Sequence, residues 1–355
     1  MGLQPGIQEA GMSGMQVSVS PLTPAEITDL FYHAATKELT RMANEVCRQV
    51  HGRSVLLRGL IEFTNICSND CLYCGIRNGN RKVVRYCMEE SAILEVVREG
   101  YNRGFRSFVL QGGEDPDYTT ERICGLVRRI KGQGRGDAAV TLSCGMRRSN
   151  DYYKMVDAGA DRYLLRFETA DAKLHFSLRN CSLEARLKAL KDIRAAGFEV
   201  GSGYMLGLPG ESAEMQLANI LLCQKLHLDM IGIGPFIPHP DTPLQHARQR
   251  PLENVIRSVA LLRLALPEAH IPATTAAGSL AADGREQMIA AGANVLMPNL
   301  TPMECKRNYL LYPNKVCLLE KGIDGITDLA RQIHPLDREL NFARGDALRL
   351  ERTIR

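Results

Sequence analysis

The sequence predicts an α/β protein: a (β/α)8 barrel of the TIM type with an N-terminal helical extension and a short C-terminal extension. From Arg58 onward, short β-type runs alternate with amphipathic helical runs, which is typical of a parallel sheet covered by helices. Glycine recurs where a helical run meets the next β run, at 104, 159, 197 and 292, and glycine supplies the left-handed cap that ends a helix. The chain of 355 residues is long enough for a barrel of about 250 residues and both extensions.

The chain divides into four expected stretches. Residues 1–20 are interpreted as a flexible leader, because they are rich in Gly, Ser, Gln and Met and show no apolar period. Residues 21–57 should form N-terminal helices, starting where Thr23 can cap a first turn that contains Pro24 and Glu26. The barrel should occupy 58–305, and 306–355 should close one end of it.

Eight strand–helix units are expected within the barrel. The strands are predicted at 58–63, 107–111, 138–143, 162–167, 198–205, 229–234, 271–275 and 294–297. The helices are predicted at 89–103, 119–131, 149–158, 182–196, 212–226, 251–266, 283–291 and, after a longer gap, 323–333. Eight units favour a closed barrel over an open sheet.

Composition excludes several classes of protein. Eleven cysteines without a signal peptide indicate a reducing compartment rather than a disulfide framework. No apolar run approaches the ~20 residues that span a bilayer. The net charge of +4 is too small and too dispersed to indicate nucleic-acid binding. We therefore expect a soluble cytoplasmic protein.

The most informative stretch follows the first predicted barrel strand. Cys67, Cys71 and Cys74 form a Cys-x3-Cys-x2-Cys pattern, which brings three thiolates to one side of a short loop. A structural zinc site normally has four protein ligands, and no fourth Cys or His lies nearby. An iron–sulfur cubane held by three thiolates keeps one iron open for a further ligand. Buried core thiols and a structural zinc or cluster site remain as alternatives.

Polar residues also follow the second and third predicted strands, where a barrel of this class places its active site. The second strand runs into Gly112, Gly113 and Glu114, whose carboxylate can pair with an ammonium group, although an ordinary turn has the same pattern. Thr141 and Ser143 share one face of the third strand by period two.

The fourth strand carries charge on one parity. Arg162, Leu164, Arg166 and Glu168 occupy alternate positions, so their side chains lie on one face of the strand, which should point into the barrel. A buried charged side chain costs several kcal/mol unless it forms an ion pair or binds a ligand, so we expect a binding site here, with a structural salt-bridge network as the alternative. Glycines on the fifth strand would let a backbone approach a ligand closely, and the region around Ile237 after the sixth strand would form a rigid apolar wall.

With Tyr73 directly before its last cysteine, the loop resembles the cluster loop of the radical S-adenosylmethionine (SAM) superfamily. In that superfamily the open iron chelates the amino and carboxylate groups of SAM, and an electron from the cluster cleaves SAM to an adenosyl radical. Longer strings resemble the HydE family of FeFe-hydrogenase maturases from about Arg58 to Cys317. These strings lie at 72–75, 113–116, 158–166, 232–243, 271–276 and 312–317.

The resemblance implies roles for individual residues. The catalytic cluster ligands are Cys67, Cys71 and Cys74. The residues around the cofactor are Tyr73, Gly113, Glu114, Ser143, Glu168, Arg186 and Ile237. The residues of the inner substrate cavity are Gln111, Thr141, Arg162, Arg166, Met230, Thr274, Thr275, Met297 and Tyr309.

The resemblance also implies cofactors, a substrate and partners. The cofactors are a 4Fe–4S cluster and SAM. The substrate is a cysteine-bound Fe(CO)2CN synthon made by a partner maturase of the HydG type, and the adenosyl radical adds to its cysteine sulfur. The product then goes toward the di-iron subcluster of the hydrogenase, with a GTPase scaffold of the HydF type and an external electron donor as further partners.

One departure and three rival hypotheses accompany this resemblance. Some family members hold a second, C-terminal cluster on a cysteine that matches Cys317, but the downstream matching positions here are Gly325 and Asp328, so we expect no second cluster. Methylornithine synthase is the runner-up, while biotin synthase has a strand cysteine where this chain has Gly201. A non-catalytic iron–sulfur carrier is the rival from another class.

Overall fold

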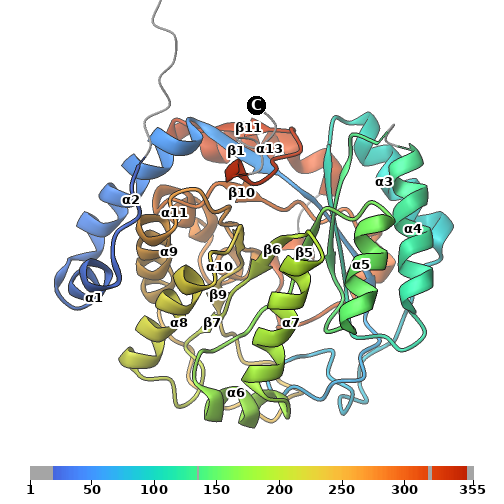
Figure 1. Ribbon diagram of the computed structural model, residues 1–355, viewed down its shortest axis with the longest axis horizontal. Helices are drawn as coiled ribbons and strands as arrows, with labels where there is room; N and C mark the ends of the chain where they lie inside the picture. The colour runs from blue at the N-terminus through green and yellow to red at the C-terminus, as the bar shows by residue number, and fades with distance from the viewer. Residues whose placement is uncertain (1–18, 134–135, 319–321, 350–355) are drawn as a thin grey trace, which may run out of the picture.

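The computed structural model describes residues 19–133, 136–318 and 322–349. Its main sheet is parallel, in the order β2 (Gly59–Thr64), β3 (Ser107–Gly112), β4 (Ala139–Ser143), β5 (Arg162–Leu164), β6 (Glu199–Ser202) and β8 (Met230–Ile231). The strands lie at the centre of the molecule with helices around them (Figure 1). Most residues predicted as leader, 1–18, lie outside the described residues.

Isolated bridges close this sheet into a barrel. Met230 bridges to His270, Pro272 bridges to Val295 of β10 (Val295–Leu296), and Asn299 bridges back to Leu60 of β2, each in parallel. The segment 270–272 and β10 therefore take the last two positions of the ring. The predicted strand at 271–275 is present only as these bridges, since α10 (Thr275–Leu280) begins at its end. The prediction of a TIM-type barrel is confirmed.

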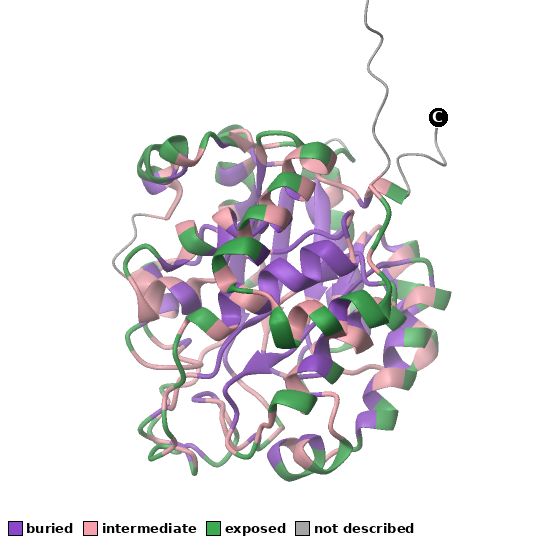
Figure 2. Cartoon of the chain, turned by 90° about the vertical axis from the view of Figure 1, so that its left-hand side faces the viewer, coloured by how far each residue is buried: buried purple, intermediate pink, exposed green. Residues whose placement is uncertain are grey.

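The covering helices follow the predicted order. They are α3 (Glu90–Asn102), α4 (Thr120–Gln133), α5 (Ser149–Asp157), α7 (Leu183–Ala195), α8 (Ala213–Lys225), α9 (Glu253–Ala265) and α11 (Gly284–Ala290). Each turns an apolar face to the sheet; Tyr152 of α5, for example, packs edge-on against Tyr163 of β5 with ring centroids 5.2 Å apart. Figure 2 shows the result, with buried strands in the interior and the exposed surfaces of the helices outside. Among the described residues, no helix has both the length and the apolarity to cross a membrane.

The N-terminal extension is a helical pair that packs on the barrel. Thr23 and Glu26 form the expected capping box at the start of α1 (Pro24–His33). The second helix, α2 (Thr36–His51), packs against α9, which is buried along most of its length. Between α2 and the barrel lies β1 (Ser54–Leu57), a strand inside the stretch that we expected to be helical.

The C-terminal segment returns to the N-terminal ends of the barrel strands. After α12 (Met303–Lys306), η1 (Val316–Leu318), η2 (Gly322–Gly325), α13 (Ile326–Ile333) and η3 (His334–Leu336), strand β11 (Glu339–Asn341) pairs in parallel with β1. In Figure 1 β1 and β11 lie at one end of the molecule, opposite α6 (Ala172–Arg179). The helix α6 and the small sheet of β7 (Met205–Leu206) and β9 (Gly234–Pro235) were not predicted, and both lie near the other end of the barrel.

Candidate active site

A cavity of about 320 Å³ lies at the C-terminal ends of the barrel strands. Its wall includes sixteen residues from the predicted site: Cys67, Cys71, Tyr73, Cys74, Gln111, Gly113, Glu114, Ser143, Arg166, Glu168, Arg186, Ile237, Thr274, Thr275, Met297 and Tyr309. The structure thus brings together the cysteine loop, the strand ends and the segment 309–317. Three predicted residues, Thr141, Arg162 and Met230, are not part of this wall.

The cysteine loop is held in shape by its own polar groups. The Arg85 guanidinium donates to the carbonyls of Asn65 and Ile76, at 2.6 and 2.7 Å, and so spans the loop. The Asp70 carboxylate accepts from the backbone N–H of Gly79 at 2.7 Å. Gly75 must be glycine, because a Cβ there would lie 2.0 Å from the carbonyl oxygen of Leu310. This close approach brings the segment that carries Tyr309 against the loop.

The cysteine thiols lie in a partly buried environment. The Glu114 backbone N–H donates to Cys67 Sγ at 3.4 Å, and a Cβ on Gly113 would lie 2.1 Å from the carbonyl oxygen of Ile66. This glycine therefore allows the end of β3 to approach the loop. Burial raises the pKa of Cys71 and of Cys74, so metal binding here must displace thiol protons.

The donor set fits an iron–sulfur cluster better than a zinc ion. Among the residues that the structure describes, no group of three or more His, Cys, Asp or Glu side chains is arranged to hold one metal ion. A cubane cluster binds each thiolate through a different iron, so its three thiolates need not converge on one point. The cavity beside Cys67, Cys71 and Cys74 leaves room for a further ligand on the fourth iron.

A group of charged side chains lines the same cavity beside the cysteine loop. Glu168 lies 3.3 Å from Arg166 and 3.7 Å from Arg179, and Glu114 lies 3.9 Å from Arg179. Glu168 has a φ of 66°, a left-handed conformation that costs a non-glycine residue about 1–3 kcal/mol. Backbone strain of this kind is concentrated at ligand sites.

Several polar atoms of this wall have no hydrogen bond to the described residues. They are Nε of Arg166, Arg179 and Arg186, and Oε2 of Glu168. Buried polar groups are normally satisfied, so atoms left in this state beside a cavity indicate the position of a polar ligand. An amino acid moiety, which carries both an ammonium and a carboxylate, matches a wall of this mixed charge.

Arg179 is a site residue that sequence reasoning missed. It is the last residue of α6, and its guanidinium donates to the hydroxyl of Tyr73. Burial works to lower its pKa, but Tyr73, Cys71, Glu168 and Glu114 raise it well above the usual value. The signal in the sequence was a pair of caps: Asp171 accepts from the N–H of Leu174 at the start of α6, and Asn180 takes the left-handed conformation at its end.

The inner wall of the cavity contains a second pair that was not predicted. Lys315 Nζ donates to Glu62 Oε1 at 2.7 Å and to the Tyr309 carbonyl at 2.8 Å, and Asn299 donates to Glu62 Oε2 at 2.9 Å. Both charged side chains are almost fully buried. An acidic residue inside the apolar run of 60–63 was the sequence signal for this pair. The pair ties the segment carrying Tyr309 to β2.

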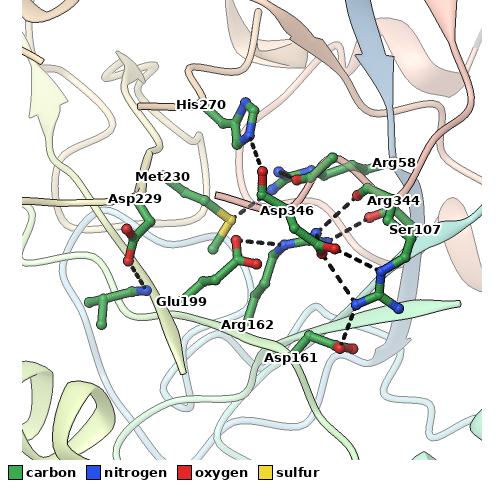
Figure 3. Close-up of polar contacts among 12 residues, drawn as sticks. Arg58, Ser107, Asp161, Arg162, Glu199, Asp229, Met230, His270, Arg344 and Asp346 are labelled. Carbon is green, nitrogen blue, oxygen red and sulfur yellow. Dashed lines mark hydrogen bonds and ion pairs between the residues drawn. The ribbon is translucent and has the colours of Figure 1, made fainter. Parts of the chain in front are cut away.

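Arg162 and Met230, the first residues of β5 and β8, belong to a different cluster of polar contacts (Figure 3). The Arg162 guanidinium donates to Glu199 at 3.0 Å, to Ser107 at 3.1 Å and to Asp346 at 2.6 Å. Met230 Sδ accepts from Arg58 in the same cluster. Arg162 and Met230 are not among the residues that line the cavity, and residues 344–346 contribute to their surroundings.

Thr141 is also outside the cavity. It is 2% exposed, and its Oγ1 has no hydrogen-bond partner among the described residues. Ser143, two residues further along β4, does line the cavity. The lining of the cavity thus includes Ser143 of β4 but not Thr141, which lies two residues earlier on the same face.

Comparisons with known proteins identify the family. A family model of the radical SAM superfamily matches residues 61–223, and a model of the biotin and thiamin synthesis associated domain matches residues 233–315. The FeFe-hydrogenase maturase subunit HydE of Thermotoga maritima is 42% identical over 317 residues, which cover 89% of this chain and 90% of that protein. The chain belongs to the HydE family of radical SAM proteins.

Other radical SAM proteins are more distant. The 3-methylornithine synthase of Methanosarcina acetivorans is 26% identical over 77% of this chain and 78% of that protein. The crystal structure of methylornithine synthase (PylB) matches with a TM-score of 0.77 and 25% identity, covering 91% of this chain and 95% of that one. Membership of the HydE family makes the chain a radical SAM enzyme and implies a 4Fe–4S cluster and SAM as its cofactors.

Proposed function

We propose that this enzyme acts in the maturation of FeFe-hydrogenase, on a cysteine-bound Fe(CO)2CN synthon destined for the di-iron subcluster. The observation that carries the proposal is the continuity of the cavity. One wall holds the cysteine loop, and the same cavity extends to the inner residues Gln111, Thr274 and Tyr309. A radical formed at the loop and a substrate inside the barrel would therefore share one cavity.

The cofactor wall supplies binding and orientation. A 4Fe–4S cluster on Cys67, Cys71 and Cys74 would supply the electron that cleaves SAM reductively to methionine and an adenosyl radical. Glu114 can accept a hydrogen bond from the cofactor ammonium, and the buried Arg186 guanidinium can donate to its carboxylate. Glu168, Ser143 and the apolar Ile237 wall complete the proposed cofactor contacts.

The inner wall is proposed to hold the substrate. Arg166 has a guanidinium nitrogen without a hydrogen-bond partner and can bind the carboxylate of a cysteine-based substrate. Gln111, Thr274, Thr275, Met297 and Tyr309 surround the same space. Lys315 and Glu62 are added to this proposed substrate wall, whereas Arg162, Met230 and Thr141 are removed from it.

The proposed partners follow from the substrate. A partner maturase of the HydG type would supply the synthon, a GTPase scaffold of the HydF type would receive the product, and an external donor would supply the electron. A second cluster at Cys317 is not proposed. That thiol is 2% exposed, and Gly325 and Asp328 replace the downstream cysteines of the members that hold one.

The proposal is tested on anaerobically reconstituted enzyme. After reduction with dithionite, SAM should shift the EPR signal of the cluster, and 5′-deoxyadenosine or an adenosyl adduct should form. Adding the iron–cysteine synthon should convert SAM into the adduct, and Cys71→Ala should abolish SAM cleavage. An enzyme that cleaves SAM but ignores the synthon would instead support the methylornithine synthase alternative. A cluster signal unmoved by SAM, or a Cys71→Ala variant that still cleaves SAM, would overturn the catalytic role.

A further inference from the structure

The helix α6 contacts the cysteine loop directly, and the proposed function does not use this contact. The backbone N–H of Leu72 donates to the carbonyl of Leu178 at 2.9 Å, and Arg179 donates to the hydroxyl of Tyr73. Both loop residues lie between the second and third cysteines. The part of the loop that carries Cys71 and Cys74 is therefore attached to α6 by one backbone and one side-chain hydrogen bond.

A small apolar cluster, separate from the main core, supports this attachment. Its buried members are Leu178, Met205, Leu208 and Phe236, and Leu72, Tyr73, Leu174, Leu244 and Ala247 pack against them. The main core lies between the barrel strands and the outer helices and does not include these residues. The Tyr73 ring is thus held by apolar packing, which fixes the position of its hydroxyl group.

Arg179 is placed to orient that hydroxyl. Its side chain is 10% exposed and lies within 4 Å of both Glu168 and Glu114, which hold the guanidinium in place. A phenol hydroxyl has one hydrogen to donate. Since Arg179 donates to the Tyr73 oxygen, the phenol hydrogen is free to point elsewhere, and Cys71, two residues before Tyr73, lines the same cavity.

We propose that Arg179 is a positioning residue that orients the Tyr73 hydroxyl toward Cys71 Sγ and thereby sets the reduction potential of the cluster held by this loop. Hydrogen bonds and positive charge near the thiolates stabilise the reduced, more negative cluster. Arg179 provides the charge and Tyr73 the hydrogen bond. The proposal rests on the cluster assignment within the proposed function but is independent of the substrate.

The test is a redox titration of reconstituted enzyme without SAM or substrate, followed by EPR. Arg179→Gln and Tyr73→Phe should each move the midpoint potential to a more negative value. At a fixed solution potential, the reduced-to-oxidised ratio should fall about tenfold, the effect of losing one hydrogen bond to a charged group. Arg179→Lys keeps the charge and should recover part of the shift.

The double variant decides whether Arg179 acts through Tyr73. Because the two residues form one chain of contacts, Arg179→Gln with Tyr73→Phe should shift the potential by less than the sum of the single shifts. Lys173→Gln is the matched control, since it removes an exposed cation from the same helix and should leave the potential unchanged. Additive shifts, an unmoved potential in either single variant, or an equal shift in Lys173→Gln would overturn the proposal.

Two further readouts keep the result interpretable. If Arg179→Gln fails to hold its cluster, Tyr73→Phe and Arg179→Lys test the same chain, because both preserve the packing of the loop. A failure of the proposed function would appear as synthon that is not consumed, while the potential shifts would remain. A failure of the positioning role would leave the potentials of the variants equal to that of the wild type, while the wild-type enzyme still consumes the synthon.

Discussion

The two ends of the barrel hold two clusters of buried charge in opposite states. At the N-terminal ends of the strands, the Arg162 guanidinium donates through all three of its nitrogens, to Glu199, Ser107 and Asp346. At the C-terminal ends, Arg166 and Arg186 leave their Nε atoms without a hydrogen-bond partner among the described residues. Arg162 and Arg166 lie four residues apart and share one parity of the chain. Their residue type and strand face do not separate structure from function, but their hydrogen-bond partners and exposure do, since the Arg162 side chain is fully buried and that of Arg166 is 30% exposed.

The difference has an energetic basis. A buried ion pair gains stability only when its remaining hydrogen-bonding groups are also satisfied. Arg162 meets this condition, because residues 344–349 cross the barrel end and add their own charges, with Arg344 on Asp161 and Arg349 on Asp229. In the same cluster, Nε of Arg58 has no hydrogen-bond partner among the described residues. The C-terminal cluster does not meet it, and its cavity remains open to a ligand. We infer that the first cluster stabilises the barrel and the second binds cofactor and substrate.

The largest effect that tests this contrast is expected from Arg162→Met. Removing the guanidinium leaves Glu199 as a buried carboxylate without its ion-pair partner, whereas Asp346 keeps Arg344, and the loss should cost about 3–5 kcal/mol in the free energy of unfolding. The dissociation constant for SAM should be unchanged in the folded fraction, because Arg162 does not line the cavity. Urea unfolding and an EPR titration with SAM measure the two quantities.

Arg166→Met is the matched control for Arg162→Met. Its lost hydrogen bond to the Tyr204 carbonyl is partly exposed, so its unfolding free energy should fall less. Its substrate turnover should fall more, since Arg166 lines the cavity. The reverse pattern, with Arg162→Met stable and inactive, would show that Arg162 reaches the substrate after all.

These two arginines also show how far the sequence could predict the site. Period two along the fourth strand correctly predicted which side chains point inward. It could not predict how far along the barrel axis each side chain lies from the cavity, because this depends on where the cavity begins and on which residues cover the end of the barrel. One of the hydrogen-bond partners of Arg162 is Asp346, which lies 184 residues away in a segment that the sequence identified only as a closing extension.

Local signals were the most reliable guide. The cysteine spacing, the glycine junctions and the capping box at Thr23 each depend on residues close in the chain, and all three match the structure. The β1–β11 pair was missed because its strands are short and separated by nearly the whole chain. The short helix α6 was missed for a different reason: its apolar residues serve a small separate cluster, so it lacks the broad apolar face of the barrel helices.

A smaller effect is expected from Asp346→Asn, and it depends on pH. The hydrogen bond from Arg344 and the charges of Arg162, Arg344 and Arg58 outweigh burial and lower the pKa of Asp346. A lowered carboxylate pKa contributes stability above the unfolded-state value of about 3.9, and this stability is lost as pH falls through the folded-state pKa. The variant should therefore be less stable than the wild type by about 1–2 kcal/mol at pH 7.

The pH dependence separates this ionic contribution from a packing defect. The stability difference between wild type and Asp346→Asn should hold from neutral pH down to about pH 5 and shrink below about pH 4. Urea unfolding of the cluster-free proteins, followed by circular dichroism across this range, measures it. A difference that stays constant down to pH 3 would mean that the amide disturbs packing rather than charge.

The smallest effect concerns Thr141, which lies between the two clusters. Its hydroxyl is buried and has no partner among the described residues, so Thr141→Val should leave the free energy of unfolding unchanged or raise it by up to about 1 kcal/mol. Turnover of SAM and of the synthon should also be unchanged. Ser143→Ala is the matched variant on the same face of β4, and it should weaken SAM binding because Ser143 lines the cavity. Loss of turnover in Thr141→Val would extend the binding region one strand step deeper, toward Arg162, and remove the sharp boundary between the two ends.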